Sequence, residues 1–271
     1  MRPLHDADLR TVRAVFTDVD GTLTTGGRMH SSTLKAIEWL VGHGLQVVLV
    51  SGRPAGWGEC WARQLPVAGV IVENGGLYFA RHADGRLKKV YAQPSLAARI
   101  ANRARLVREV KASLKVVPGA RLSMDSVATE VDLAIDYAEE AALGQSGADR
   151  LEAFLHARGI TAVRSSVHVN CWVGKFDKRS MVEKFIRTEW RAELRGSDPR
   201  YVYVGDSYND EPMFRAFSLS VGVANVRDVI DRLGHLPKFV TRAREGKGFR
   251  EVADAIVRQR LSSSHLKSES P

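Results

Sequence analysis

Four short segments of this chain are almost continuously apolar, and each is followed by turn residues and a helical pattern. They span residues 12–16, 47–50, 70–72 and 201–204. Strands have this composition when helices cover both faces of a parallel sheet, because neither face of the strand then meets water. The repeated alternation of strand and helix predicts an α/β fold whose core is a Rossmann-like, doubly wound parallel sheet.

The middle of the chain has a different pattern. Residues 130–137 and 167–173 alternate between apolar and polar side chains, which predicts an antiparallel sheet with one buried face and one free polar face. Helical patterns over residues 95–115 and 148–158 are suited to cover the apolar face. We therefore expect a small α+β domain, residues 81–172, inserted into a core formed by residues 1–80 and 173–261. Residues 262–271 are polar and rich in serine, and we expect them to be disordered.

Composition narrows the class of protein. Hydrophobic residues make up 44% of the 271 residues and charged residues 26%, as in ordinary globular proteins. No apolar run approaches the roughly eighteen residues that cross a bilayer, and the first residues lack the apolar segment of a secretory signal. We expect a cytoplasmic protein without a membrane partner. Cys60 and Cys171 lie far apart and indicate neither a disulfide framework nor a zinc site.

The net charge of +9 raises the alternative of a nucleic-acid-binding protein. Residues 81–121 contain eleven Lys and Arg against two acids, whereas residues 122–160 contain eight acids against two basic residues. Neighbouring segments of opposite charge favour adjacent helix surfaces over a nucleic-acid groove. Tyr91 is the one aromatic residue within the basic run, which also disfavours base stacking. We therefore regard nucleic acid as an unlikely partner.

The first chemical signal is Asp18-Val19-Asp20-Gly21-Thr22, directly after an apolar strand. Ligands of open α/β sheets bind at the carboxyl ends of the strands, so both carboxylates are well placed for catalysis. A carboxylate can accept a phosphoryl group, and a second acid can protonate the leaving oxygen and later activate water. Alone, this segment is equally compatible with a loop or a set of calcium ligands.

A second acidic segment, Gly205-Asp206-Ser207-Tyr208-Asn209-Asp210, follows another strand of the same predicted sheet. Asp206 and Asp210 could complete an oxygen-rich shell for Mg²⁺, which takes one or two carboxylates besides water and substrate phosphate. Either Asn209 or Asp210 could also serve as a helix N-cap. Two acidic strand ends on one sheet edge predict a magnesium site.

Two smaller signals lie between these segments. Ser51 ends a strand just before Gly52 and Pro54, where its hydroxyl could donate to a phosphate at a helix N-terminus. Lys178 opens a helix and could neutralise charge on a phosphoryl group. Taken singly, the two are also compatible with a turn residue and a surface lysine.

In order along the chain, these signals resemble the four motifs of the haloacid dehalogenase superfamily. An inserted domain between the Ser and Lys motifs is similar to the large cap of the subgroup (IIB) that holds Cof-type sugar phosphatases, sucrose-phosphate and mannosyl-phosphoglycerate phosphatases, and phosphomannomutases. Glu73-Asn74-Gly75-Gly76 is similar to the Asn-Gly turn that precedes this cap.

The resemblance implies a role for each matched residue. Asp18 would be the nucleophile and Asp20 the general acid and base, while Ser51 and Lys178 would hold the transferring phosphoryl group. Mg²⁺ would be held by Asp18, the backbone carbonyl of Asp20, and Asp206, with support from Asp210. Dehalogenases of the superfamily lack the second aspartate, so Asp20 favours phosphoryl transfer, which depends on positioning and charge neutralisation.

Substrate choice is expected to depend on a further set of polar residues. These are Arg53, Asn74, His168, Asn170 and Asn209. The expected function is a magnesium-dependent phosphatase that hydrolyses a small phosphorylated metabolite, with a sugar phosphate as the leading class, through an aspartyl-phosphate. A phosphosugar mutase with the same motifs is the alternative. The sequence leaves the oligomeric state open, with a homodimer among the options.

Overall fold

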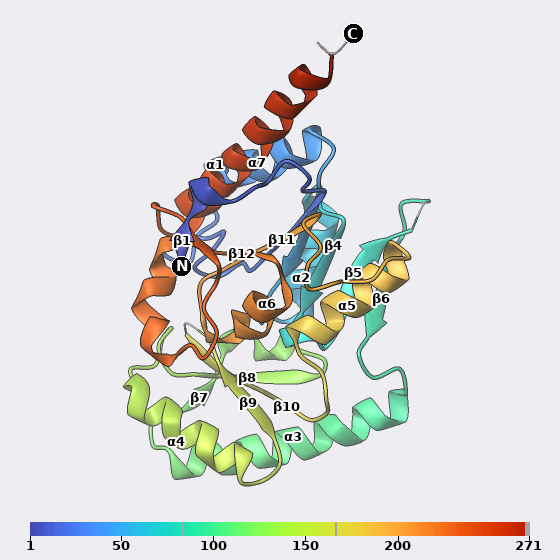
Figure 1. Cartoon of the computed structure of the whole chain (residues 1–271). Helices are drawn as coiled ribbons and strands as arrows, with labels where there is room; N and C mark the ends of the chain where they lie inside the picture. The colour runs from blue at the N-terminus through green and yellow to red at the C-terminus, as the bar shows by residue number, and fades with distance from the viewer. Residues whose placement is uncertain (83, 166, 269–271) are drawn as a thin grey trace. The chain divides into compact units, whose positions relative to one another are not determined.

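The computed structural model describes residues 1–82, 84–165 and 167–268, which form two compact units. The first unit contains Met1–Val50, Gln64–Gly69 and the chain from Ile186 onward, and the second contains Ser51–Arg63 and Val70–Phe185. Because each unit is assembled from separated stretches, residues distant in the sequence are brought together inside it. The α/β architecture that the apolar segments predicted is confirmed (Figure 1).

The first unit is built on parallel strands. In the order in which they pair, they are β1 (Arg2–Pro3), β13 (Phe239–Val240), β12 (Leu219–Gly222), β11 (Tyr201–Gly205), β2 (Ala14–Thr17) and β3 (Gln46–Val50). The central strands β2 and β11 are buried along their whole length, as their continuous apolar composition predicted. Parallel pairing brings the carboxyl ends of β2 and β11 to the same edge of the sheet.

Helices cover this sheet. They are α1 (Ser31–Gly42), α6 (Glu211–Ala216) and α7 (Glu245–Ser268), with 3-10 turns η1 (Leu4–Asp6), η4 (Tyr208–Asp210) and η5 (Ala224–Arg232). The helix α1 buries Ala36, Ile37 and Leu40 at the spacing of one helical face, and it packs against α7 (Figure 1).

Helix α7 differs from the expectation for the end of the chain. We expected disorder from residue 262, but the helix continues through Ser268, and residues 269–271 lie outside the described part. The hydroxyls of Ser262 and Ser263 donate to the carbonyls of Arg258 and Gln259, one helical turn back. Such bonds satisfy serine hydroxyls inside a helix but slightly weaken it, and the expected disorder of residues 262–271 stays a prediction.

The second unit contains the predicted antiparallel sheet. Its strands pair in the order β7 (Arg121–Leu122), β8 (Asp132–Asp136), β10 (His168–Trp172) and β9 (Thr161–Arg164). Helices α3 (Leu96–Val116) and α4 (Gly144–His156) cover its apolar face, and the core between them includes Leu133, Val169 and Cys171 (Figure 1).

The other elements of this unit precede and follow the antiparallel sheet in the chain. They are α2 (Ala55–Gln64), β4 (Gly69–Val72), η2 (Glu73–Gly75), β5 (Leu77–Arg81), β6 (Leu87–Tyr91), η3 (Met124–Ala128) and α5 (Lys178–Glu189), of which α2, β4 and α5 extend into the first unit. Strands β5 and β6 form an antiparallel hairpin that crosses residue 81, where we placed the start of the inserted domain. The division of the chain at residues 81 and 172 stays a prediction.

The polar face of the antiparallel sheet is not free, contrary to our expectation. Asp132, Asp136, His168 and Asn170 are all at most 5% exposed. Within the unit, Asn74 donates to Asp132 and Glu139 approaches His168. Alternation of polar and apolar residues shows that the two faces differ, but it does not show that the polar face meets water.

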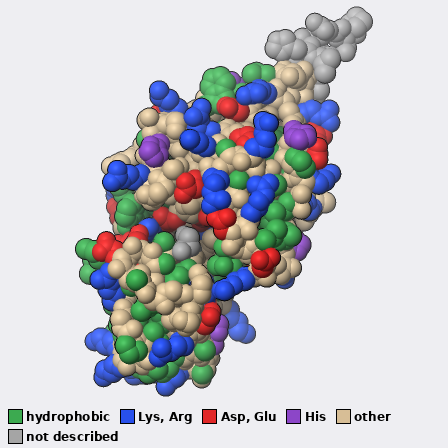
Figure 2. Space-filling view, turned by 90° about the vertical axis from the view of Figure 1, so that its left-hand side faces the viewer, with side chains coloured by type: hydrophobic (Ala, Val, Ile, Leu, Met, Phe, Trp, Pro, Cys, Tyr) green, Lys and Arg blue, Asp and Glu red, His purple; other side chains and the backbone are tan. Residues whose placement is uncertain are grey.

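The basic stretch between residues 81 and 121 is largely engaged within the second unit. On α3, Arg99 donates to the carbonyl of Pro94, Arg103 to that of Asp132 and Arg105 to that of Arg158. On the face displayed in Figure 2, Lys and Arg side chains are interspersed with acidic ones and do not form one continuous band. Among the described helices, none combines the length and the apolar composition that a membrane span needs.

Candidate active site

Asp18 is the first residue after β2, and its position is fixed by the neighbouring strand. Its backbone N–H donates to the carbonyl of Val204 in β11 over 2.8 Å, which continues the parallel ladder by one residue. The side chain is only 4% exposed. A carboxylate is thus held in a buried position at the carboxyl edge of the sheet, where the sequence predicted it.

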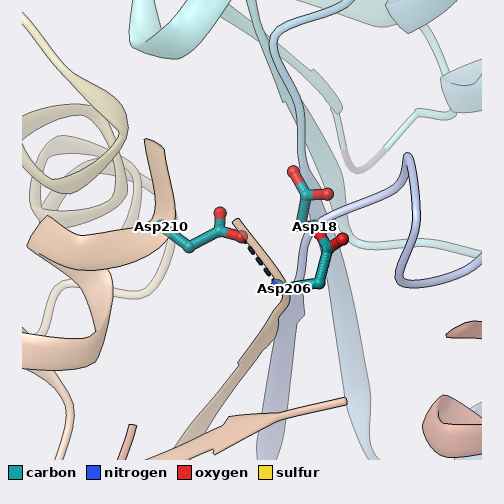
Figure 3. A group of neighbouring side chains, drawn as sticks. All are labelled: Asp18, Asp206 and Asp210. Atoms are coloured by element: carbon teal, nitrogen blue, oxygen red, sulfur yellow. Dashed lines mark hydrogen bonds between the residues drawn. The ribbon is translucent and has the colours of Figure 1, made fainter. Parts of the chain in front are cut away.

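Asp206 and Asp210 come to the same place from β11. Each of Asp18, Asp206 and Asp210 offers one oxygen to a group in which these atoms all lie within 4.8 Å of one another (Figure 3). All three residues are buried. Three carboxylates this close repel one another unless protons or a cation compensate their charge. The predicted convergence of two distant acidic segments is therefore observed.

Gly21 is required by the close approach of these segments. Its φ is +76°, in the left-handed region that favours glycine, and a Cβ built there would lie 2.4 Å from Oδ2 of Asp206. No side chain fits at that distance, so the glycine of the Asp-x-Asp-Gly turn allows the carboxylate of Asp206 to sit against the loop.

Asp206 is oriented by two side chains that sequence reasoning missed. The hydroxyl of Thr22 donates to Oδ1 over 3.2 Å, and the amide of Asn225 donates to Oδ2 over 2.7 Å. The same amide donates to the carbonyl of Gly21, and the Asn225 carbonyl accepts the N–H of Glu245. Thr22 belongs to the Asp18–Thr22 segment, which the sequence analysis identified. Asn225 belongs to no motif, and nothing in the sequence around it indicates a role.

Asp210 is held differently from Asp206. Its Oδ1 accepts the hydroxyl of Tyr203 over 2.5 Å, and its Oδ2 accepts the backbone N–H groups of Asp206 and Ser207. Burial and the neighbouring charge of Asp210 raise the pKa of Tyr203 well above its ordinary value, so this hydroxyl remains a donor. Because its Oδ2 accepts two backbone N–H groups of the turn that carries Asp206, Asp210 chiefly fixes that turn.

Two other residues predicted for the site, Asp20 and Asn209, also belong to the first unit. Among the described residues, the carboxylate group above does not include Asp20, which is half-buried. Asn209 uses its side-chain carbonyl to accept the hydroxyl of Ser207, which is the N-cap of η4 and forms a capping box with Asp210. Ser207 is therefore the N-cap of η4, whereas Asp210 takes the N-cap position of α6, as expected, without a side-chain capping hydrogen bond there.

Ser51 and Lys178 belong to the second unit. The Ser51 hydroxyl oxygen accepts the backbone N–H of Arg53 over 3.0 Å, and the side chain is buried. Lys178 opens α5 and is also buried, which is unusual for a lysine and disfavours a plain surface role. Their contact with a phosphoryl group stays a prediction.

The Asn-Gly turn lies against the start of α5. Gly75 has a φ of +95°, and a Cβ there would lie 2.1 Å from the carbonyl oxygen of Asp177 and 3.0 Å from the backbone nitrogen of Lys178. Only glycine lets the turn touch the first residue of the helix in this way. The turn and the Lys motif, far apart in the sequence, are therefore parts of one local structure.

Four residues that we assigned to substrate binding gather in the second unit. Arg53 pairs with Glu139 over 2.9 Å and with Asp125 over 3.3 Å. His168 Nε2 lies 2.8 Å from a carboxylate oxygen of Glu139, close enough for an ion pair but without hydrogen-bond geometry. Asn74 and Asn170 both approach Gly52, because a Cβ there would lie within 3.3 Å of each side chain.

A buried acid pair beside this group was not anticipated. Glu73 is fully buried, and its carboxylate accepts four backbone N–H groups, those of Ala55, Glu130, Val131 and Asp132. Asp132 is 1% exposed, and Oδ1 of its carboxylate has no hydrogen-bond partner. Burial raises the pKa of both groups, and the charge of Glu73 raises that of Asp132 further.

Comparison with known proteins agrees with this geometry. Residues 15–114 match the family model of the haloacid dehalogenase-like hydrolases. A protein from Thermoplasma acidophilum is similar in structure, with a TM-score of 0.68, 22% identity, and coverage of 91% of this chain and 99% of that one.

Two further solved structures resemble the chain. The sucrose-phosphatase from Synechocystis, solved with sucrose and phosphate, has a TM-score of 0.62 and 15% identity over 92% of this chain and 98% of its own. A subclass IIB sugar phosphatase of the haloacid dehalogenase superfamily has a TM-score of 0.61 and 17% identity over 93% and 99%. At these identities the likeness establishes the fold. With the family match, it confirms the resemblance to the haloacid dehalogenase superfamily that the four motifs indicated.

Proposed function

We propose that this chain is a magnesium-dependent phosphatase that hydrolyses a small phosphorylated metabolite, with sugar phosphates as the leading class. The observation that carries the proposal is the buried group of three carboxylates, from two segments 188 residues apart, that meet at one edge of a parallel sheet. The family model matched by residues 15–114, which describes hydrolases, supports the same reading.

The donor set fits a hard divalent cation. All the converging ligand atoms are carboxylate oxygens, which suit Mg²⁺ better than a soft metal. Gly21 leaves the space against Asp206 open, and Thr22 and Asn225 fix the direction of that carboxylate. Asp18 and Asp206 would hold the ion with the carbonyl of Asp20, while Asp210 supports the turn. A bound Mg²⁺ would neutralise charge on the phosphoryl oxygens.

The protein residues would then divide the reaction into two steps. In the first, a carboxylate oxygen of Asp18 attacks phosphorus, the bond to the leaving oxygen breaks, and Asp20 gives that oxygen a proton. In the second, Asp20 takes a proton from water, whose oxygen attacks the aspartyl-phosphate and releases inorganic phosphate. Ser51 and Lys178, assigned by resemblance, would hold the phosphoryl oxygens during both steps.

Two observations favour sugar phosphates as the substrates. One concerns residues of the second unit, and the other concerns the similar solved structures. Arg53, Asn74, His168 and Asn170 form a group rich in hydrogen-bonding atoms, which suits a polyhydroxylated leaving group. The similar structures include a sucrose-phosphatase and a sugar phosphatase. We infer that this group contacts the sugar.

The test is phosphate release by the full chain from an aryl phosphate and from a panel that includes sucrose phosphate, mannose phosphates and glucose phosphates. Release that needs Mg²⁺, stops with EDTA and is fastest for one of the sugar phosphates supports the proposal. Interconversion of hexose phosphate isomers without accumulation of inorganic phosphate would instead identify a mutase. No turnover of any phosphate ester at any Mg²⁺ concentration would contradict both.

A further inference from the structure

A cavity of about 740 Å³ that is open to the surface lies in the first unit, at the end of α5 and before β11, and its arginines are exposed. Its lining residues are Arg187, Arg191, Ala192, Glu193, Arg195, Ser197, Asp198, Pro199 and Arg200. Four of these nine are arginines and two are acids, so the lining carries an excess of positive charge. Neither the family match nor the assigned residues include this region.

The pairing of charges leaves three of the arginines available. Arg200 binds Asp198 with both ends of its guanidinium, over 2.7 and 2.9 Å, and lowers the pKa of that carboxyl. Among the residues that the structure describes, no acid lies within ion-pair distance of Arg187, Arg191 or Arg195. Arg195 acts on Asp198 only through its charge and forms no ion pair, so the guanidinium groups of Arg187, Arg191 and Arg195 all stay free of direct carboxylate contacts in the described part of the chain.

The backbone of Arg191 supports a role for its side chain. Its φ is 50°, in the left-handed region, just after α5, and the next N–H, that of Ala192, donates back to Ile186 over 3.3 Å. Glycine is the favoured residue where a helix ends in this conformation, and any other residue costs stability. An arginine at such a position, where it lines the cavity, indicates that its side chain has a role that offsets the backbone strain.

The cavity is separate from the carboxylate group. Arg200 immediately precedes β11, whereas Asp206 immediately follows it. A strand of five residues spans about 16 Å, because each residue advances roughly 3.3 Å. The arginines therefore lie at the opposite edge of the sheet from Asp18, and a ligand held there is not in contact with the proposed nucleophile.

We propose that this arginine cavity is a second anion site, which binds a small molecule with two or more neighbouring phosphate groups. A planar guanidinium can bind one phosphate through two parallel hydrogen bonds, so three free arginines exceed what a single phosphate needs. The volume lies within the usual range for small-molecule sites. None of the lining residues is aromatic, so the site offers no ring on which a base could stack.

The test is calorimetric titration of the full chain with pyrophosphate, in EDTA so that no cation can bridge it to the carboxylate group. The test variant combines Arg187→Gln, Arg191→Gln and Arg195→Gln. Its matched control combines Arg10→Gln, Arg215→Gln and Arg258→Gln, three arginines of the first unit that pair with Asp8, Glu211 and Asp254. We expect the test variant to bind at least about 30-fold more weakly, and the control within about twofold of the parent.

Arg191→Gly separates ligand binding from stability. It should weaken pyrophosphate binding by about tenfold, the loss of one charge-assisted contact, and yet raise the melting temperature because glycine relieves the left-handed backbone. Asp206→Asn should leave pyrophosphate affinity unchanged, so this result is independent of the proposed phosphatase. Absence of binding to the parent, equal loss in both triple variants, or binding of a single-stranded oligonucleotide in place of pyrophosphate would overturn the proposal.

Discussion

Among the described residues, each unit contains a group of buried acids, and the protein holds the two groups in different ways. In the first unit, carboxylate oxygens of Asp18, Asp206 and Asp210 approach within 4.8 Å of one another. In the second, Glu73 lies beside Asp132, and its carboxylate accepts four backbone N–H groups. Both groups are buried away from water, so the protein must offset the cost of burying their charges.

The difference shows that burial alone does not define a metal site. The backbone amides around Glu73 supply the donors that its oxygens need, and a raised pKa lets a proton remove the charge of Asp132. In the first unit the donors fix the direction of Asp206, while one oxygen from each of Asp18, Asp206 and Asp210 still lies within 4.8 Å of the others. We therefore expect a cation to matter for the first group and protons to matter for the second.

Replacement of the proposed nucleophile should have the largest effect. Asp18→Asn should lower phosphate release by about 10³-fold or more, because an amide cannot form the aspartyl-phosphate. The melting temperature should not fall, because the variant removes one of three mutually repelling charges. Steady-state kinetics with an aryl phosphate and a thermal melt check both parts. Asp8→Asn, an exposed aspartate of the same unit, is the control, and near-normal turnover of Asp18→Asn would exclude it as the nucleophile.

Gly21→Ala should come next in size. The added Cβ would meet Asp206 Oδ2 at 2.4 Å, so the carboxylate must move, and we expect an activity loss of about 10–100-fold with a higher Mg²⁺ requirement. Gly26→Ala is the matched control, because Gly26 also has a positive φ but nothing lies within 4 Å of its added Cβ. Both variants carry backbone strain, and only the first disturbs Asp206. Equal Mg²⁺ titrations of the two would show that this approach has no role in cation binding.

The sequence predicted those parts of the fold that have a strong local pattern. Helix α3 was predicted over residues 95–115, within one residue of its observed bounds at each end, because its sequence has a helical pattern. Strand β6 was not predicted, because Lys88 and Lys89 interrupt any alternation and the strand is at best half-buried. Edge strands often carry such charges, so the hairpin that crosses residue 81 could not be recognised from periodicity.

The candidate site was likewise predictable only where a local sequence pattern marks its residues. Asp18 and Asp206 were found because each follows an apolar strand, and parallel strands end at one edge. Asn225 was missed because it acts through a single amide in η5, with no motif around it. Glu73 was seen only as part of a turn, since nothing in the sequence shows that a glutamate is fully buried. Contacts made by tertiary packing alone leave no local signal.

Glu73→Gln tests the second group through stability. A glutamine keeps one acceptor oxygen but turns an NH₂ group toward two backbone N–H donors, which then lose their partner. We expect the free energy of unfolding to fall by about 2–4 kcal/mol, as for buried donors left unsatisfied. Urea unfolding of the full chain measures it. The control is Glu59→Gln on α2, which removes an exposed pair with Arg63 and should cost well under 1 kcal/mol. A loss as small as that of the control would mean that the four amides do not depend on the carboxylate.

Asp132→Asn should have the smallest effect and the opposite sign. Burial and the charge of Glu73 raise the pKa of Asp132 in the folded state, so the folded chain holds this proton more tightly than the unfolded chain. Stability is then lost as pH rises from about 4, the ordinary aspartate value, through the raised pKa. Asparagine does not titrate, and it can still accept the Asn74 amide.

The variant should therefore be more stable than the parent at pH 8, by about 1 kcal/mol or roughly 2–4 °C in melting temperature, with a smaller difference at pH 4. Thermal melts across this range provide the measurement, and Asp136→Asn is an informative contrast. Burial alone would raise the pKa of Asp136, but three backbone N–H groups outweigh it and lower that pKa, so its replacement should destabilise the fold at pH 8. If Asp132→Asn behaved like Asp136→Asn, the carboxylate of Asp132 would be stabilised as an anion. The second group would then keep its charges without a proton, and the contrast between the two buried groups would fail.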